Sequence, residues 1–137
     1  MQTSENGIAF IKANEGFVGH VGNDVGRLVI GYGHDLQPGE SFPNGISPDQ
    51  ADLLLRKDLA SRFEPAVNAV IPPDCTQNQF DALADFCFNL GPGSLRMMVG
   101  HGWDQIPVQM PYWMHVAGVE NAGLKARRAA EVELFNS

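Results

Sequence analysis

The chain opens with a helical pattern of apolar positions that ends in a carboxylate. Ile8 and Ile11 are three residues apart and Glu15 follows four residues later, so all three share one stripe of a helix predicted over residues 4–15. Gly16 is a typical residue for the end of such a helix. An acidic side chain at the end of an apolar stripe is unusual, because a charge beside a core is costly.

Residues 17–34 change to a β-type pattern. Two short runs rich in aliphatic and aromatic residues, 17–18 and 28–30, flank a polar and glycine-containing stretch around Asp24. This arrangement predicts a short hairpin or a small sheet with its turn near Asp24.

A long helix is predicted over residues 47–64. Ser47 and Gln50 form a capping box, in which each side chain satisfies a free backbone N–H of the first turn. Pro65 either ends this helix or kinks it, because proline lacks the N–H that the helix needs.

The remaining half of the chain also shows helical patterns. Thr76 and Gln79 repeat the capping box and open a helix over residues 76–90. Its apolar stripe consists of Phe80, Leu83, Cys87 and Leu90. Residues 97–118 indicate helical pieces broken by Pro107 and Pro111, and residues 123–135 indicate a last helix. The sequence thus predicts a mostly helical α+β fold with one small β element near the N-terminus, within a single domain over residues 1–137.

Composition and charge narrow the function. With 9 basic and 16 acidic residues the net charge is 9 − 16 = −7, which argues against nucleic acid and against anionic membrane surfaces as partners. No apolar run is long enough to span a bilayer, and the N-terminus lacks the pattern of a signal peptide. We therefore expect no membrane insertion, synthesis in the cytoplasm of a bacterial host, and a monomer.

Cysteine and histidine placement gives no sign of a metal site or a cofactor. Cys75 and Cys87 are separated by roughly 18 Å if the intervening chain is helical, which is too far for a disulfide, so we expect two free thiols. There is no C-x-x-C motif, and the four histidines share no ligand spacing.

Glu15 and Asp24 form the candidate catalytic pair. Glycoside hydrolysis needs a proton donor for the leaving oxygen and a second carboxylate. An apolar setting would keep Glu15 protonated, while a polar turn would keep Asp24 ionised. The spacing alone is weak support, because most carboxylates of an acidic chain are solvated surface groups.

Three segments strengthen the catalytic interpretation of this pair, because together they resemble the phage-type lysozymes, also called endolysins or muramidases. They are residues 15–17 with Asp24 and 30–34 (Ile-Gly-Tyr-Gly-His), residues 76–83 with 86–91, and residues 123–135. Their order and spacing cover nearly the whole chain. The resemblance implies a two-lobed lysozyme-like fold, with a β-containing lobe over about residues 16–46, a linking helix over about 47–64 and a helical lobe over about 74–137.

The resemblance also implies an activity and roles for individual residues. The activity is metal-free hydrolysis, with inversion, of the β-1,4 bond between N-acetylmuramic acid and N-acetylglucosamine in bacterial peptidoglycan. Glu15 is implied as the general acid, and Asp24 as the group that activates water or stabilises positive charge on the sugar. Arg127 matches an arginine that pairs with the acid; it would favour ionised Glu15 against the effect of burial, and the sequence leaves open which effect dominates.

Supporting roles fall on three further residues. Tyr32 and His34 belong to the glycine-rich segment beside the expected cleft, and His34 is either structural or in contact with substrate. Asn89 is expected to be a buried hydrogen-bonding residue that supports the hinge.

Val29 departs from the family pattern, which has threonine there to hold the attacking water. Two alternatives therefore stay open: a lytic transglycosylase that depends mainly on Glu15, and a catalytically weak peptidoglycan-binding module. A small acidic interaction domain is a third, weaker interpretation. The acidic charge is a second departure; we expect repulsion from teichoic-acid-rich cells at low salt, and action on the wall only after holin-type release or export.

Overall fold

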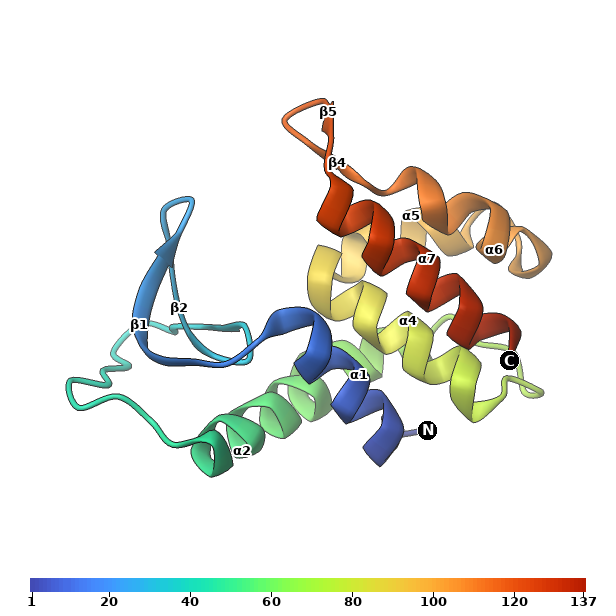
Figure 1. The fold of residues 1–137 in the computed structure, drawn as a ribbon. Coiled ribbons are helices and arrows are strands. Elements are labelled where there is room, and N and C mark those ends of the chain that lie inside the picture. The colour runs from blue at the N-terminus through green and yellow to red at the C-terminus, as the bar shows by residue number, and fades with distance from the viewer.

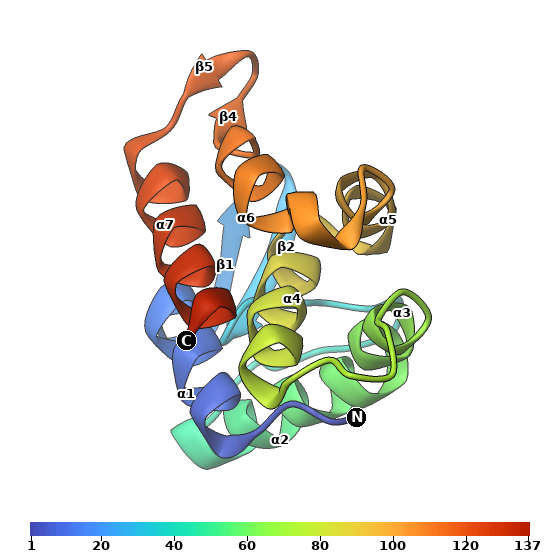
Figure 2. The ribbon, with the colours of Figure 1, turned by 90° about the vertical axis from the view of Figure 1, so that its right-hand side faces the viewer.

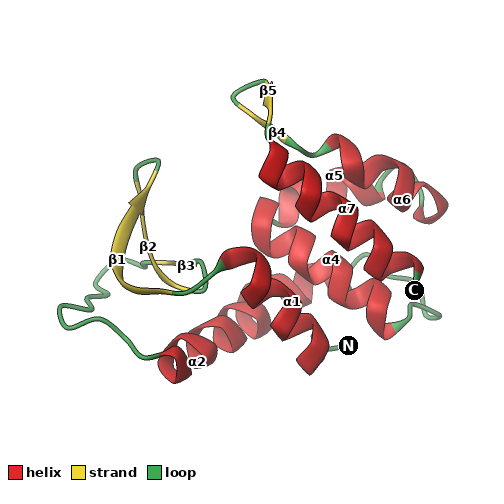
Figure 3. Cartoon of the chain, viewed as in Figure 1, coloured by secondary structure: helices red, strands yellow, loops and turns green.

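The computed structural model describes residues 1–137 as a small sheet set beside a bundle of helices (Figure 1, Figure 3). The helices are α1 (Glu5–Glu15), α2 (Pro48–Asp58), α3 (Glu64–Asn68), α4 (Gln77–Leu90), α5 (Pro92–Val99), α6 (Ile106–Gln109) and α7 (Ala122–Asn136), with helical turns η1 (Leu59–Phe63), η2 (Trp103–Gln105) and η3 (Met110–Tyr112). The strands are β1 (Val18–Asp24), β2 (Arg27–Gly31), β3 (His34–Asp35), β4 (His115–Val116) and β5 (Val119–Glu120). The fold is α+β and mostly helical, which confirms the predicted class.

Helix α1 is fixed at both ends. The Ser4 hydroxyl caps its first turn, and Asp81 of α4 accepts hydrogen bonds from the Ser4 backbone N–H, at 2.9 Å, and from the Ser4 hydroxyl. Ile8 and Ile11 are buried, as their spacing predicts. Gly16 ends the helix at a positive φ of 70°, which places the preceding residue at the edge of the core.

The predicted hairpin is present and forms most of a three-stranded antiparallel sheet in the order β1-β2-β3. Asp24 pairs with Arg27, so the turn itself consists of Val25 and Gly26. Both turn residues have positive φ values, of 49° and 83°, as a two-residue hairpin of this type requires.

The long helix continues past its predicted end. Helix α2, turn η1 and helix α3 follow one another without a break from Pro48 to Asn68. Leu55, Leu59, Phe63 and Val67 are all buried at intervals of four residues. An α-helix has 3.6 residues per turn, so such a row drifts around it; the π-helical turn η1 takes up the extra residue and keeps the row on one side.

Pro65 does not end this helix. It occupies the first turn of α3, directly after the π-turn. There the Glu64 N–H donates to the carbonyl of Leu59, five residues back, rather than to the carbonyl four residues back. Proline at the start of a new α-helical stretch loses no hydrogen bond that the helix would otherwise make.

Helix α4 is the centre of the bundle and packs against α1, α5 and α7 (Figure 2). Its predicted stripe is buried at Phe80, Leu83 and Cys87. Burial raises the pKa of the Cys87 thiol to about 11, and both cysteines are free, as predicted. None of the helices has the length and apolar character needed to cross a bilayer.

The segment between α5 and α7 is where the sequence-based prediction was incomplete. Pro107 and Pro111 each stand in the first turn of a short helical piece, as expected. However, β4 and β5 form a second antiparallel hairpin that the sequence did not indicate. Its strands have two residues each, which is too short for an alternating pattern to be recognised.

Candidate functional site

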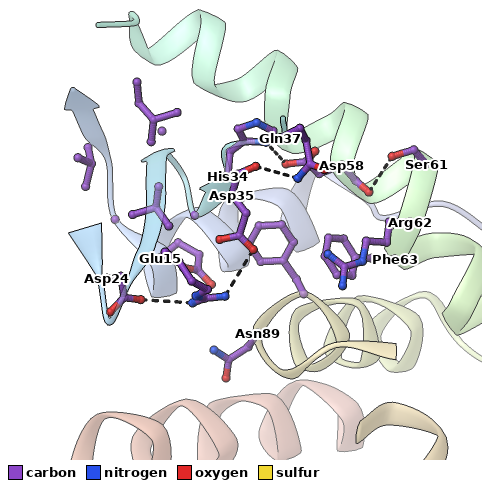
Figure 4. A pocket seen from close by; sticks show the side chains of 18 residues that line it. Glu15, Asp24, His34, Asp35, Gln37, Asp58, Ser61, Arg62, Phe63 and Asn89 are labelled. Atoms are coloured by element: carbon purple, nitrogen blue, oxygen red, sulfur yellow. Dashed lines mark hydrogen bonds and ion pairs between the residues drawn. The ribbon is translucent and has the colours of Figure 1, made fainter. Parts of the chain in front are cut away.

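A groove of about 440 Å³ lies between the sheet and the helical bundle (Figure 4). The end of α1, all three strands of the sheet, the junction of α2 with η1, and the end of α4 contribute to it. Its lining consists of Glu15, Gly16, Val18, Asp24, Arg27, Val29, Ile30, Gly31, Gly33, His34, Asp35, Gln37, Asp58, Ser61, Arg62, Phe63, Phe88 and Asn89. The groove brings together five of the seven predicted site residues. Tyr32 and Arg127 lie outside its lining.

Glu15 enters the groove from the last position of α1. Its side chain is 19% exposed, so it is sheltered but reachable. Gly33 is packed against it: a Cβ atom on Gly33 would lie 2.7 Å from Glu15 Oε2 and 3.2 Å from the ring of Phe88. Gly33 also has a φ of +76°. Both the conformation and the close approach therefore require glycine at this position.

Burial dominates the electrostatics of Glu15. It raises the pKa of the carboxyl group, and the hydrogen bond from Arg127 Nη2 to Glu15 Oε1, at 2.8 Å, lowers it by a smaller amount. The net direction is upward. The structure thus answers the question that the sequence left open: burial outweighs Arg127, and the pKa of Glu15 is raised.

Arg127 is held behind Glu15 by a buried carboxylate. Its guanidinium donates to both oxygens of Asp85 on α4, at 2.8 and 2.9 Å. The pKa of Arg127 is raised: burial opposes the charge, but Asp85 and Glu15 outweigh that penalty. The bidentate contact fixes the orientation of Nη2, which also donates to Glu15 Oε1.

A second buried ion pair continues this network across α7. Arg128 and Glu131 are both completely buried, with Arg128 Nη2 2.8 Å from Glu131 Oε1. Burial, together with the negative charge of Asp85, raises the pKa of Glu131. Arg128 also donates to Asn89 Oδ1 at 2.7 Å, so Asn89, which is half-buried rather than buried as predicted, links the groove to this pair.

Asp24 lines the groove from the end of β1, at the hairpin turn. Its side chain is 60% exposed and pairs with Arg27 at 3.3 Å. Arg27 also reaches Asp35 on β3 at 3.4 Å, so one guanidinium bridges two carboxylates of the sheet. The predicted pair therefore meets at the groove in two different settings, with Glu15 sheltered and Asp24 in water.

His34 acts as a brace between the sheet and the long helix. It is buried, with Nδ1 2.7 Å from Asp58 Oδ2 and Nε2 2.9 Å from Glu40 Oε1. Burial alone would lower the pKa of His34, but the two carboxylates outweigh burial and raise it. Both ring nitrogens are engaged, which favours the structural interpretation of His34 over direct contact with substrate.

Of the two remaining predicted residues on the sheet side, Val29 lines the groove and Tyr32 does not. Val29 presents a half-buried apolar side chain to the groove from the middle of β2. Tyr32 instead packs against Phe17, with ring centroids 5.6 Å apart, and lies beneath the ammonium group of Lys12 at 5.2 Å. Tyr32 thus anchors the sheet to α1 rather than lining the groove.

The sequence analysis named mostly residues that line the groove, but it missed the charged residues that pair with them. Asp85 carries a recognisable signal, since Asp81 and Asp85 are two acids one turn apart in the otherwise apolar stretch 80–88 of α4, and such residues need buried partners. Arg27, Asp58 and Glu40 carry none, because surface-type charges of this kind are common in the sequence. Among all residues, no group of three or more histidine, cysteine or acidic side chains is placed to hold a metal ion.

The geometry is suited to acid–base chemistry on a ligand with many oxygens. One carboxyl group with a raised pKa can donate a proton, and an exposed carboxylate at the hairpin can support water or positive charge. The groove is open and rimmed by polar groups, as an extended polar chain requires.

Comparison with known proteins gives one consistent family. The family model described as phage lysozyme matches residues 12–131. The endolysin of Bacillus phage PZA is 36% identical over 149 residues, which cover the whole of this chain and 56% of that protein. This chain thus spans little more than half the length of such relatives.

Two solved structures extend the likeness to the fold. The muramidase domain of SpmX from Asticaccaulis excentricus has a TM-score of 0.84 and 33% identity, covering 99% of this chain and 98% of that one. The endolysin from Escherichia coli O157:H7 phage FAHEc1 has a TM-score of 0.83 and 32% identity, covering 98% and 93% respectively.

Proposed function

Since the chain belongs to the phage lysozyme family, we propose that it hydrolyses the glycan strands of bacterial peptidoglycan, at the β-1,4 bond between N-acetylmuramic acid and N-acetylglucosamine. The observation that carries this proposal is the raised pKa of Glu15 at the edge of an open groove that Asp24 also lines. The similarity to an endolysin and to a muramidase domain supports the same substrate.

Glu15 is the general acid of the proposed reaction. It protonates the glycosidic oxygen, so that the bond to the leaving sugar breaks as positive charge develops at the anomeric carbon. Burial raises the pKa of the carboxyl group, and Arg127 donates to it at 2.8 Å. Burial thus favours the protonated acid before the transfer, and Arg127 favours the carboxylate after it.

Asp24 is the second carboxylate of the proposed reaction. Its exposure gives water direct access, and the hairpin turn holds it on the sheet side of the groove. In the inverting scheme it activates the water that attacks the anomeric carbon. No threonine hydroxyl is present beside it, because Val29 occupies that place in β2.

The test is mass spectrometry of muropeptides after digestion of purified peptidoglycan, beside Glu15→Gln and Asp24→Asn. We expect reducing N-acetylmuramic acid ends from the parent chain, none above background from Glu15→Gln, and a large loss for Asp24→Asn. Products from Glu15→Gln at the parental rate would overturn the proposed role of Glu15. Binding without any cleavage by the parent chain would favour a peptidoglycan-binding module.

One observation favours a second candidate, a lytic transglycosylase. Val29 offers no hydrogen bond to a water molecule, and Asp24 is engaged with Arg27. Without a positioned water, the 6-hydroxyl of the sugar can attack the anomeric carbon and leave a 1,6-anhydro end. The same mass spectra distinguish the two reactions, since the anhydro product is lighter by one water.

A further inference from the structure

The π-turn η1 forms one wall of the groove and presents Arg62 on it. Ser61 and Arg62 both line the groove, while Leu59 and Phe63 on either side of them are buried. In an uninterrupted α-helix Phe63 would drift away from the buried row, so the π-turn fixes Phe63 and, with it, the direction of Arg62. Figure 4 shows Arg62 and Asp24 at opposite ends of the lining.

Arg62 is the one arginine of the groove without a carboxylate partner. Arg27, the other arginine of the lining, pairs with Asp24 and Asp35. Asp58, one turn before Arg62, is engaged by His34 at 2.7 Å. Arg62 itself is exposed, and its guanidinium carbon lies 5.0 Å from the centroid of the Phe63 ring.

Contact with the ring restricts Arg62 without neutralising it. A guanidinium over an aromatic face keeps its N–H groups free at the edge and loses less conformational freedom when it binds an anion. The surroundings are otherwise acidic, with a net charge of −7 on the chain and several carboxylates in the groove. A free, oriented cation in such a groove is suited to an anionic group of the ligand.

We propose that Arg62 binds a carboxylate of the peptide stem that branches from the glycan. This inference rests on the proposed function and deepens it. In intact peptidoglycan the lactyl carboxyl group of muramic acid is in an amide bond, so the free carboxylates of the glycopeptide are those of the peptide. Arg62 lies away from Asp24, where a branch can leave the glycan path. The contact makes Arg62 a binding residue that selects substituted over bare glycan.

The test compares Arg62→Gln with Arg96→Gln on two substrates. Arg96 is also exposed, belongs to none of the chain's ion pairs and lies outside the groove, so the two variants have the same net charge. The substrates are teichoic-acid-free peptidoglycan and the same material with its carboxylates converted to amides by carbodiimide and ammonia. Reducing-end release gives KM and kcat, and cosedimentation gives binding.

On native peptidoglycan we expect Arg62→Gln to raise KM about fivefold to tenfold with little change in kcat, because the contact is remote from the reacting bond. On amidated peptidoglycan the parent, Arg62→Gln and Arg96→Gln should have the same KM within about twofold. Arg62→Lys should recover part of the loss on native material.

Two outcomes would overturn the inference. One is equal loss for Arg62→Gln on native and amidated substrate, which would show that Arg62 contacts sugar or only packs on Phe63. The other is equal loss for Arg96→Gln, which would show general charge steering. If no protein cleaves either substrate, the proposed function fails, and cosedimentation of the same proteins still decides whether Arg62 recognises the carboxylate.

Discussion

The carboxylate of Glu15 accepts a hydrogen bond at 2.8 Å from Arg127, 112 residues further along the chain. The contact joins the end of the first helix to the last helix, across the central helix α4. Asp85 on α4 holds the same guanidinium with two hydrogen bonds. The acidity of Glu15 is therefore set by three helices together, and its raised pKa reports the balance between burial and one oriented cation.

Asp85→Asn is expected to lower the pKa of Glu15. The negative charge of Asp85 raises that pKa, and its removal also leaves Arg127 more available to Glu15. Because the acid must be protonated, the alkaline limb of the kcat/KM profile should move to lower pH. Asp81→Asn is the matched control: Asp81 is an equally buried acid one turn away that binds Ser4, the N-cap residue of α1, and its exchange should leave the limb in place. A limb that stays fixed or moves upward in Asp85→Asn would contradict the assignment.

Gly33→Ala is expected to displace the carboxyl group of Glu15, the proposed general acid. The new Cβ would lie 2.7 Å from Glu15 Oε2, so the side chain must move, and a displacement of about 1 Å costs roughly 10²-fold in rate. Gly39→Ala isolates the effect of backbone strain, since Gly39 has a φ of +85° but no atom within 4 Å of the new Cβ. Gly39→Ala should lose about 1 kcal/mol of stability in thermal unfolding and Gly33→Ala at least as much, and only Gly33→Ala should lose activity. Equal activity in the two would show that Glu15 tolerates the contact.

Val29→Thr is expected to increase the rate of hydrolysis. Threonine has nearly the shape of valine and would place a hydroxyl group in the groove beside the proposed water site. One additional hydrogen bond corresponds to about a threefold to tenfold rise in kcat. Leu28→Thr serves as the control, because Leu28 precedes Val29 in β2 and does not line the groove. If Val29→Thr shifts products from anhydro to reducing ends, the parent chain is a transglycosylase.

The brace at His34 predicts a pH-dependent stability. Asp58 and Glu40 raise the folded-state pKa of His34 above its unfolded value of about 6.5, so the stabilisation is complete below that pH and is lost as pH rises through the folded-state pKa. The difference in Tm between the parent and His34→Gln should therefore shrink from pH 6 towards pH 9. His115→Gln, at an exposed position on β4, should follow the parent at every pH. A constant difference for His34→Gln would mean that the imidazole does not bear the charge.

The elements that form the groove could be predicted wherever a short stretch of sequence specifies them. The Ser47 and Thr76 capping boxes, the stripe that ends at Glu15 and the glycine-containing turn after Asp24 all lie within a few residues of the feature they specify. The π-turn was not predicted, although the four-residue spacing of apolar positions from Leu55 to Val67 is a sequence signal for it. The short second hairpin has no comparable signal in the sequence.

Partners distant in the sequence could not be predicted in the same way. Nothing near His34 indicates that Asp58, rather than another acid, will be its neighbour, because that choice depends on how the sheet docks against the long helix. The position of Tyr32 has the same origin. Its ring packs on Phe17 and under Lys12 instead of facing the groove, and only the docking of α1 on the sheet determines this.

Val25→Asn is expected to stabilise the hairpin that carries Asp24. Val25 is 95% exposed and has a φ of 49°, a left-handed conformation that is strained for a β-branched residue and natural for asparagine. No packing is lost, so we expect a gain of about 1 kcal/mol and a rise in Tm of roughly 3 °C. Val21→Asn provides the contrast: Val21 is an exposed valine within β1 with no positive φ, so the exchange should destabilise. A lower Tm for Val25→Asn would mean that the valine at the tip is held by a contact worth more than the strain it relieves.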